Sequence, residues 1–260
     1  MNLELLHLCD SLFPIGAFGY SDGLEAATDA CRGVDPLRDW LDVVLDENIG
    51  RLEGPVVWHA WLAFRERDWD ALVTLDEEMT ALRPAASARR SSRAMGLRLL
   101  TTWQALHPDP RLEHALVRAG RRELGPTLPV AFAGACGSIV RRDAVEAFAY
   151  TRLAATVSAA MRLIPIGQTD AHSLLAQTLA RVPAVVDAIA ARDADPESFT
   201  PAMDLAVMSQ QYLHSRCRDL SLTPRLGFPC PRLGAPPQRG CRAGGPGVAA
   251  GASCEILRSA

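Results

Sequence analysis

Residues that could do chemistry are few and scattered in this chain of 260 residues. The histidines do not cluster: His107 and His114 stand on either side of a predicted helix break, and Asp170 and His172 would point in different directions from one helix. Cys136 lies in an apolar segment, which favours a buried, unreactive thiol. The motifs H-E-x-x-H and G-x-S-x-G do not occur. We therefore predict no catalytic residue and no metal ligand, and a helical hydrolase is the weakest alternative.

The glycine-rich segment FPIGAFGYSDGLEAA, residues 13–27, is a candidate phosphate-binding loop by composition alone. Its glycines, at 16, 19 and 23, do not have the spacing of the dinucleotide fingerprint, and no strand pattern precedes them. All 27 basic residues are arginine, so the lysine that a Walker A loop or a Schiff base requires is absent. We exclude both kinds of chemistry.

A turn followed by a helix is the better explanation of this segment. Pro14 and Gly16 change the direction of the chain, and Asp22 with Glu25 predicts a D-x-x-E helix start. The apolar side chains at 13, 15 and 18 would then pack against the core or face a partner.

The elements that must position these residues are predicted to be helices. Apolar residues recur at helical spacing, and no alternating strand pattern of any length occurs. Gly54-Pro55 is expected to end one helix, and the helix that Asp143 begins is apolar on nearly all sides and should lie at the centre. We expect helices over about 36–52, 56–65, 70–82, 84–106, 110–123, 143–163, 168–180, 183–191 and 201–216. The predicted fold is all-α, a single-domain bundle of about ten helices covering residues 1–216.

Composition limits the partners and the compartment. The chain is 48% apolar, enough for one sizeable core, and its net charge of −3 gives no general attraction to nucleic acid or to a membrane surface. We find no secretory signal and no clear membrane span. Seven widely spread cysteines, an odd number, suit reduced thiols in a cytoplasmic protein.

The tail, residues 217–260, has a different composition. From Asp219 onward, 13 of 42 residues are proline or glycine, which predicts low order. This composition fits either a natural extension or an out-of-frame reading of GC-rich DNA. Cysteines at 217, 230, 241 and 254 lack zinc-site spacing, but together with histidines they leave a direct metal carrier as an alternative function.

Two further segments are polar or charged. Arg162 and Gln168 flank a predicted joint between helices, where Arg162 would either cap carbonyls or form part of a patch that contacts another protein. Arg89, Arg90 and Arg93 are interpreted first as a solvated helix face and second as a docking patch for an acidic surface.

Three segments together resemble the UreF family of urease accessory proteins. The first resembles the family's N-terminal signature and the second its R-L-x-P-L-[GS]-Q motif, although Ala171 and His172 depart from the usual glycine and glutamine. The third resembles M-x-H-E-x-L-x-S-R, with Gln210 and Gln211 in place of His-Glu. The matching residues are Pro14, Ile15, Gly16, Ala17, Phe18, Tyr20, Ser21, Gly23, Leu24 and Glu25; then Arg162, Leu163, Pro165, Gly167, Gln168, Leu174 and Leu175; and lastly Met208, Leu213, Ser215 and Arg216.

The resemblance implies an all-helical, dimeric, non-catalytic protein. Such a protein joins UreD (also called UreH), recruits the GTPase UreG and gates its hydrolysis, so that the complex delivers nickel to apo-urease. The complex handles the nickel, and no stably bound cofactor is implied for this chain. Among site residues, Tyr150 matches a family tyrosine and would form a hydrogen bond with the C-terminal segment, and Tyr212, Ser215 and Arg216 would lie where the partner docks. The unusual residues after Arg216 put docking to UreD/UreH in question for this chain.

Overall fold

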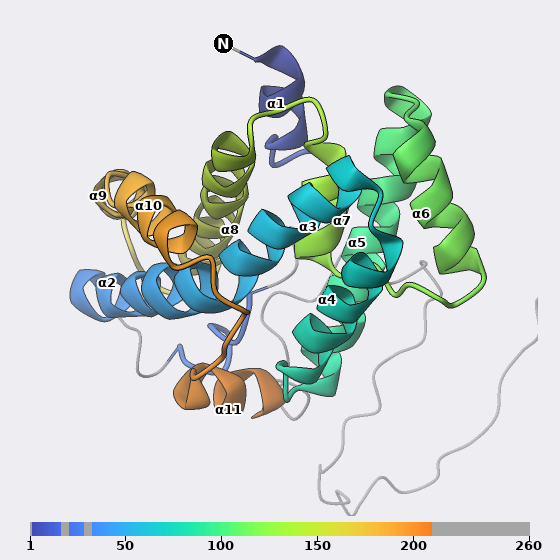
Figure 1. Ribbon diagram of the computed structural model, residues 1–260. Helices are drawn as coiled ribbons and strands as arrows, with labels where there is room; N and C mark the ends of the chain where they lie inside the picture. The colour runs from blue at the N-terminus through green and yellow to red at the C-terminus, as the bar shows by residue number, and fades with distance from the viewer. Residues whose placement is uncertain (1, 17–20, 29–32, 210–260) are drawn as a thin grey trace, which may run out of the picture. The chain divides into compact units, whose positions relative to one another are not determined.

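The computed structural model describes residues 2–16, 21–28 and 33–209. These residues form eleven α-helices and one π-helical stretch, and none of them lies in a strand. The all-α prediction is therefore confirmed (Figure 1). The elements are α1 (Leu3–Leu8), α2 (Val34–Val43), η2 (Val44–Glu53), α3 (Gly54–Glu66), α4 (Trp69–Ala81), α5 (Ala86–Leu106), α6 (Pro110–Gly120), α7 (Leu128–Ala135), α8 (Arg141–Leu163), α9 (Gln168–Leu179), α10 (Val182–Arg192) and α11 (Pro201–Ser209).

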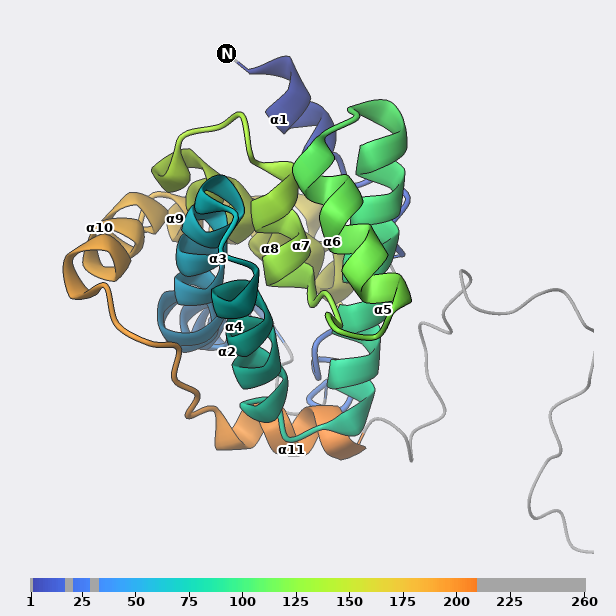
Figure 2. The same ribbon diagram turned by 45° about the vertical axis from the view of Figure 1, so that its right-hand side comes forward.

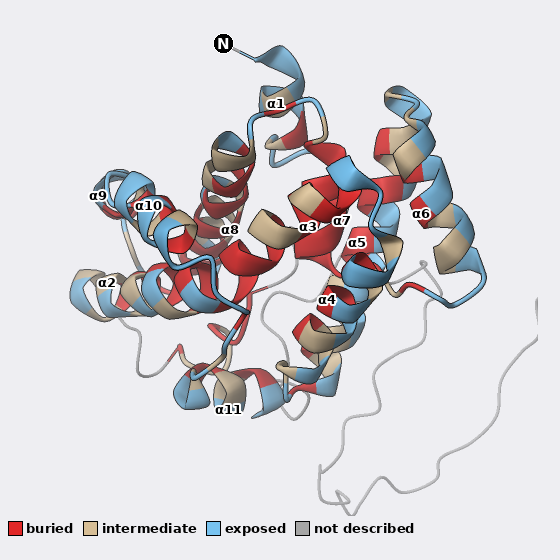
Figure 3. Ribbon diagram, in the orientation of Figure 1, coloured by how far each residue is buried: buried red, intermediate tan, exposed pale blue. Residues whose placement is uncertain are grey.

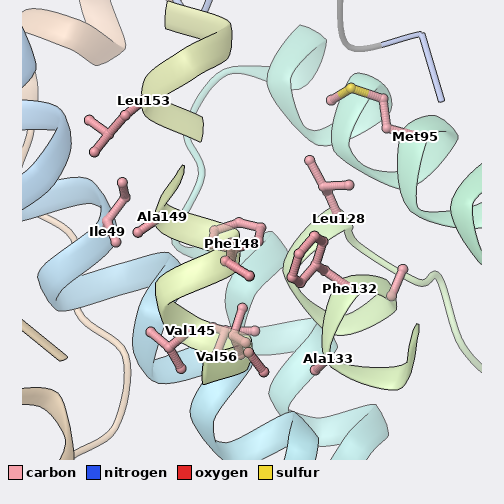
Figure 4. Packing of buried hydrophobic residues seen from close by; sticks show 14 of the residues in the cluster. Ile49, Val56, Met95, Leu128, Phe132, Ala133, Val145, Phe148, Ala149 and Leu153 are labelled. Atoms are coloured by element: carbon pink, nitrogen blue, oxygen red, sulfur yellow. The ribbon is translucent and has the colours of Figure 1, made fainter. Parts of the chain in front are cut away.

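The short helix α7 lies at the centre of the bundle. All eight of its residues are buried, and it packs against α3, α5, α6 and α8 (Figures 1 and 3). A Cβ atom added at Gly134 would lie 2.8 Å from Phe64 Cζ, so the small residue allows α3 to approach closely. Phe132 of α7 meets Phe148 of α8 edge-on, with ring centroids 5.3 Å apart (Figure 4). Helix α8, which the sequence places at the centre, packs against α2, η2, α3, α7, α9 and α10 but keeps one face partly exposed.

The predicted break at Gly54-Pro55 is wrong. The chain runs without interruption from α2 through η2 into α3, and Gly54 keeps helical dihedral angles. Its backbone N–H donates to the carbonyl oxygen of Ile49, five residues earlier, so the helix widens here into π geometry. Pro55 has no N–H to donate and sits in the first turn of α3, where that loss costs least. A Cβ at Gly54 would lie 2.6 Å from Ile189 Cδ1, so the absence of a side chain at Gly54 also lets α10 approach closely.

The helix start predicted at Asp22 and Glu25 is also wrong, because residues 22–28 form successive turns. Asp22 adopts a left-handed backbone with φ of 50°, and Gly23 follows with φ of 94°. Both values are incompatible with a right-handed helix. The proline-glycine turn before it is confirmed in part, since Gly16 has φ of 82°.

Helix α1 is held on α5 by aromatic packing. Its first turn is capped by Asn2, whose side-chain oxygen accepts from Glu4 and Leu5 backbone N–H groups at 3.0 and 3.2 Å. The Phe13 ring lies 5.8 Å from Trp103 and 5.5 Å from His7, measured between centroids. The prediction that Phe13 packs against the core is therefore confirmed, whereas Phe18 lies outside the described residues.

Residues 168–192 have the length and apolar composition that a membrane-crossing helix needs. In the structure a turn at Ala180–Arg181 divides them into α9 and α10. Both helices pack on α8, and α9 also contacts α2 while α10 contacts η2 and α3 (Figures 1 and 2).

Candidate interaction site

A groove of about 660 Å³ lies between the N-terminal segment and α8. One wall comes from α1 and the turn after it, and the other from one side of α8, from Asp143 to Ser158. Phe132 of α7 and Phe148 form part of the lining, which is mostly apolar. An apolar concavity of this kind is where folded proteins most often bind another molecule, which makes the groove our candidate interaction site.

Tyr150 lies in this groove with 43% of its surface exposed. Leu6, which also lines it, is 54% exposed. Three carboxylates, those of Asp10, Asp143 and Glu146, are also part of the lining. The groove therefore offers exposed apolar and aromatic surface together with negative charge.

A buried charge network extends from the groove into the core, starting at Arg152 of α8. The side chain of Arg152 is 9% exposed and donates from Nη2 to Asp22 Oδ2 at 2.5 Å. Its Nε donates to Glu53 Oε2 at 2.9 Å. One guanidinium thus joins the turn after the N-terminal segment to the last residue of η2.

Arg83, between α4 and α5, completes the network. Its Nη2 donates to Glu53 Oε1 at 2.5 Å and to Asn48 Oδ1 at 3.0 Å. Asn48 Nδ2 donates in turn to Asp22 Oδ2 at 3.3 Å, and Arg83 Nη1 lies 3.8 Å from Asp22 Oδ1. We call Asp22, Asn48, Glu53, Arg83 and Arg152 the core charge network; it connects four separate parts of the chain.

The core charge network contains two positive and two negative groups, so its net charge is zero. Such balance is what burial requires, because an isolated charge in the interior would cost several kcal/mol (~3–5 when one partner is removed). Asp204 of α11 lies close enough for Arg83 and Asp22 to act on it. Burial raises the pKa of Asp204, the nearby Arg83 opposes that shift, and Asp22 adds to it.

Gly23 follows Asp22 of the core charge network and packs against α11. A Cβ atom at Gly23 would lie 3.0 Å from Val207 Cγ2 and 3.2 Å from Ala206 Cβ. Val207 also packs with Ala85 and Ala88 near the start of α5. The positive φ and the close contact together explain why a glycine is needed here.

The other predicted motif residues that are described lie in three environments. Pro14 is exposed, Ser21 is buried at 5% exposure and Glu25 is half-buried. Arg162 and Gln168 are both exposed at the joint between α8 and α9, as their proposed role as a contact patch requires. Arg162 is in the last turn of α8 and donates to the Ser158 hydroxyl at 2.8 Å; Ser158 also lines the groove.

Tyr20, Tyr212, Ser215 and Arg216 lie outside the described residues, as does the tail, so their roles stay predictions. Cys136 is fully buried, as predicted, and burial raises the pKa of its thiol well above the ordinary value, which disfavours the reactive thiolate. Within residues 2–16, 21–28 and 33–209, no three histidine, cysteine, aspartate or glutamate residues are placed to hold a metal ion.

Sequence reasoning missed the core charge network. One signal was available: Arg152 interrupts a helix that is otherwise apolar on most sides, and a buried arginine needs a carboxylate partner. The partners were not available, because Asp22 is 130 positions away in sequence.

Comparison with known proteins identifies the family. The UreF family model matches residues 32–179. A urease accessory protein UreF from Azoarcus sp. strain BH72 is 30% identical over 222 residues, covering 82% of this chain and 93% of that protein. UreF from Methylorubrum populi is 31% identical over 217 residues, with 82% and 96% covered. UreF from Rhodopseudomonas palustris strain BisB5 is 33% identical over 210 residues, with 78% and 85% covered. The chain therefore belongs to the UreF family of urease accessory proteins.

Proposed function

We propose that this chain is a non-catalytic cytoplasmic scaffold of urease maturation. In this proposal it binds UreD/UreH and UreG, and the assembly delivers nickel to apo-urease. The chain regulates GTP hydrolysis by UreG through contacts, acts as a homodimer and keeps no metal of its own. Family membership supports the connection with urease.

The observation that carries the proposal is the groove beside α8. It is lined by Phe13 and Ile15 of the N-terminal segment and by α8 as far as Ser158, one turn before Arg162 of the second motif. Tyr150 and Leu6 expose apolar area that water solvates poorly, and covering it with another protein chain would be favourable. A scaffold of this kind needs a fixed shape and a partner-facing surface.

The test places a charge in the groove. Tyr150→Glu would add a carboxylate near Asp143 and Glu146, and Val117→Glu is a matched control because Val117 is similarly exposed, at 47%, on α6. We expect Tyr150→Glu to lower nickel-dependent urease activation about tenfold or more in a host lacking the native chain. Light scattering would report self-association, and co-purification would report binding of UreD/UreH and UreG.

The control should behave as the wild type in all three measurements. Folded Tyr150→Glu protein that assembles and activates urease normally would remove the groove from the proposal. Normal urease activation in a host from which the chain is deleted would remove the proposed function itself.

A further inference from the structure

The outer face of α5 carries an unusual arrangement of charge. The helix has four arginines and no acidic residue in its 21 positions. Arg90, Arg93 and Arg98 are exposed, and Ala94 and Leu97 lie between them at helical spacing. We call Arg90, Arg93, Ala94, Leu97 and Arg98 the α5 basic face.

Some of the other arginines at the surface of the described residues are paired with carboxylates within the chain, while Arg65, Arg67, Arg121 and Arg122 are exposed without such an ion pair. Arg51 lies 2.7 Å from Glu197, and Arg142 and Arg181 contact Asp187 and Asp46. The described part of the chain likewise offers Arg90 and Arg98 no ion pair with a carboxylate, and these two differ from the other four in lying on one helix that contains no acidic residue.

The neighbouring arginines of α5 use their side chains differently. Arg93 donates to the Thr80 hydroxyl at 3.3 Å, and Arg89 donates to the carbonyl oxygens of Arg83 and Pro84. Arg89 thus closes the end of the α4–α5 connection and is half-buried, which removes it from the face that the sequence suggested. Arg90 and Arg98 hold the charge that remains available to another molecule.

The helix that presents these arginines is rigidly placed. On its opposite side, a Cβ atom added at Gly96 would lie 2.2 Å from the carbonyl oxygen of Pro126, so α5 and the segment before α7 touch backbone to backbone. Met95, Leu99 and Trp103 are buried on the same side. The helix cannot rotate without losing this packing, and Arg90 and Arg98 therefore stay about 12 Å apart along its axis.

We propose that the α5 basic face docks an acidic helix of a protein partner in the urease assembly. The matching helix would carry carboxylates about two turns apart, opposite Arg90 and Arg98, and a small or apolar residue opposite Leu97, which is 44% exposed. A protein is favoured over nucleic acid because the whole chain has a net charge of −3, which repels a phosphate backbone outside this face. The inference rests on the proposed function, since it assigns one of the partner contacts of the scaffold.

The experiment reverses the two charges and leaves the fold intact. Arg90→Glu/Arg98→Glu is compared with Arg65→Glu/Arg121→Glu, which makes the same change of net charge at two exposed positions, in α3 and directly after α6. Each form of the full chain is titrated against purified UreD/UreH and UreG from the same host at low and at physiological salt. We expect the first variant to bind one partner about tenfold more weakly, with a flatter salt dependence, and the second to bind as the wild type.

Circular dichroism should give the same melting temperature for both variants. Wild-type binding that survives the reversal at both salt concentrations would overturn the inference and leave the proposed function standing. Wild-type protein that binds neither partner would overturn the proposed function and this inference with it. Equal weakening in both variants, or binding of a 20-base-pair DNA duplex that depends on Arg90 and Arg98, would also overturn it.

Discussion

Arg152 and Arg90 carry the same guanidinium group in opposite surroundings. Arg152 is 8% exposed and bonded to two carboxylates, whereas Arg90 is exposed on a helix with no acidic residue. In the interior the positive charge is paired with carboxylates of the same chain, because an unpaired buried charge would strongly destabilise the fold. At the surface water tolerates a mismatch, so the unmatched charge can serve a contact with another molecule. The comparison predicts that substitutions of the buried arginine strongly lower the stability of the fold, whereas substitutions of the exposed arginine affect only binding.

The largest effect should follow Arg152→Met, which keeps much of the side-chain volume and removes the charge. Asp22 would lose its 2.5 Å partner, and Glu53 would keep only Arg83. We expect a loss of about 3–5 kcal/mol in the free energy of unfolding. For a domain of this size that corresponds to roughly 10 °C or more in melting temperature, read by calorimetry.

Two controls define the source of that loss. Arg90→Met, at an exposed position, should change stability by no more than about 0.5 kcal/mol. Adding Asp22→Asn to Arg152→Met should recover part of the stability, because it removes one of the stranded charges. If Arg90→Met were as destabilising as Arg152→Met, the contrast between interior and surface would be wrong.

The second prediction concerns Asp76, a buried carboxylate of α4 that lacks a buried arginine partner. It is 1% exposed and accepts backbone N–H groups of Thr127 at 2.8 Å and Gly125 at 3.1 Å. Burial raises its pKa from 3.8 to about 6, and the hydrogen bonds and Arg93 only partly oppose the shift. Between these two pH values the folded state therefore keeps a proton that the unfolded state has released.

Because the folded pKa is the higher one, the contribution of Asp76 to stability falls as the pH rises from about 4 to about 6. The loss is on the order of 3 kcal/mol and is complete above pH 6. Urea unfolding of the wild type and of Asp76→Asn, compared at each pH, isolates this contribution, since the asparagine does not titrate. A difference between the two proteins that stays constant from pH 4 to 7 would contradict the raised pKa.

The helices were predictable from the sequence, while the interior charges were not. Apolar spacing located α4, α5, α9 and α10 within a few residues, because it reports a local property, the burial of one helix face. The π geometry of η2 escaped prediction because Gly54-Pro55 normally ends a helix, and the hydrogen bond from Gly54 to Ile49 and the contact with α10 that accompany its continuation leave no trace in apolar spacing. The core charge network joins Arg152 to residues 99 and 130 positions away, for which spacing carries no information.

The smallest effect tests how the core charge network connects to α11. Gly23 and Gly33 have similar φ angles, of 94° and 103°, but among the described residues neighbours lie within 4 Å of the missing Cβ at Gly23 and not at Gly33. Gly33→Ala therefore measures backbone strain alone, about 1 kcal/mol. Gly23→Ala adds the contact with Val207 and should cost about 2 kcal/mol, with faster hydrogen exchange in α11. The difference between these two losses in the free energy of unfolding measures how much packing against α11 stabilises the N-terminal motif. Equal costs, with unchanged exchange in residues 201–209, would mean that α11 rests on this motif without stabilising it, and that the motif is held by the buried charges alone.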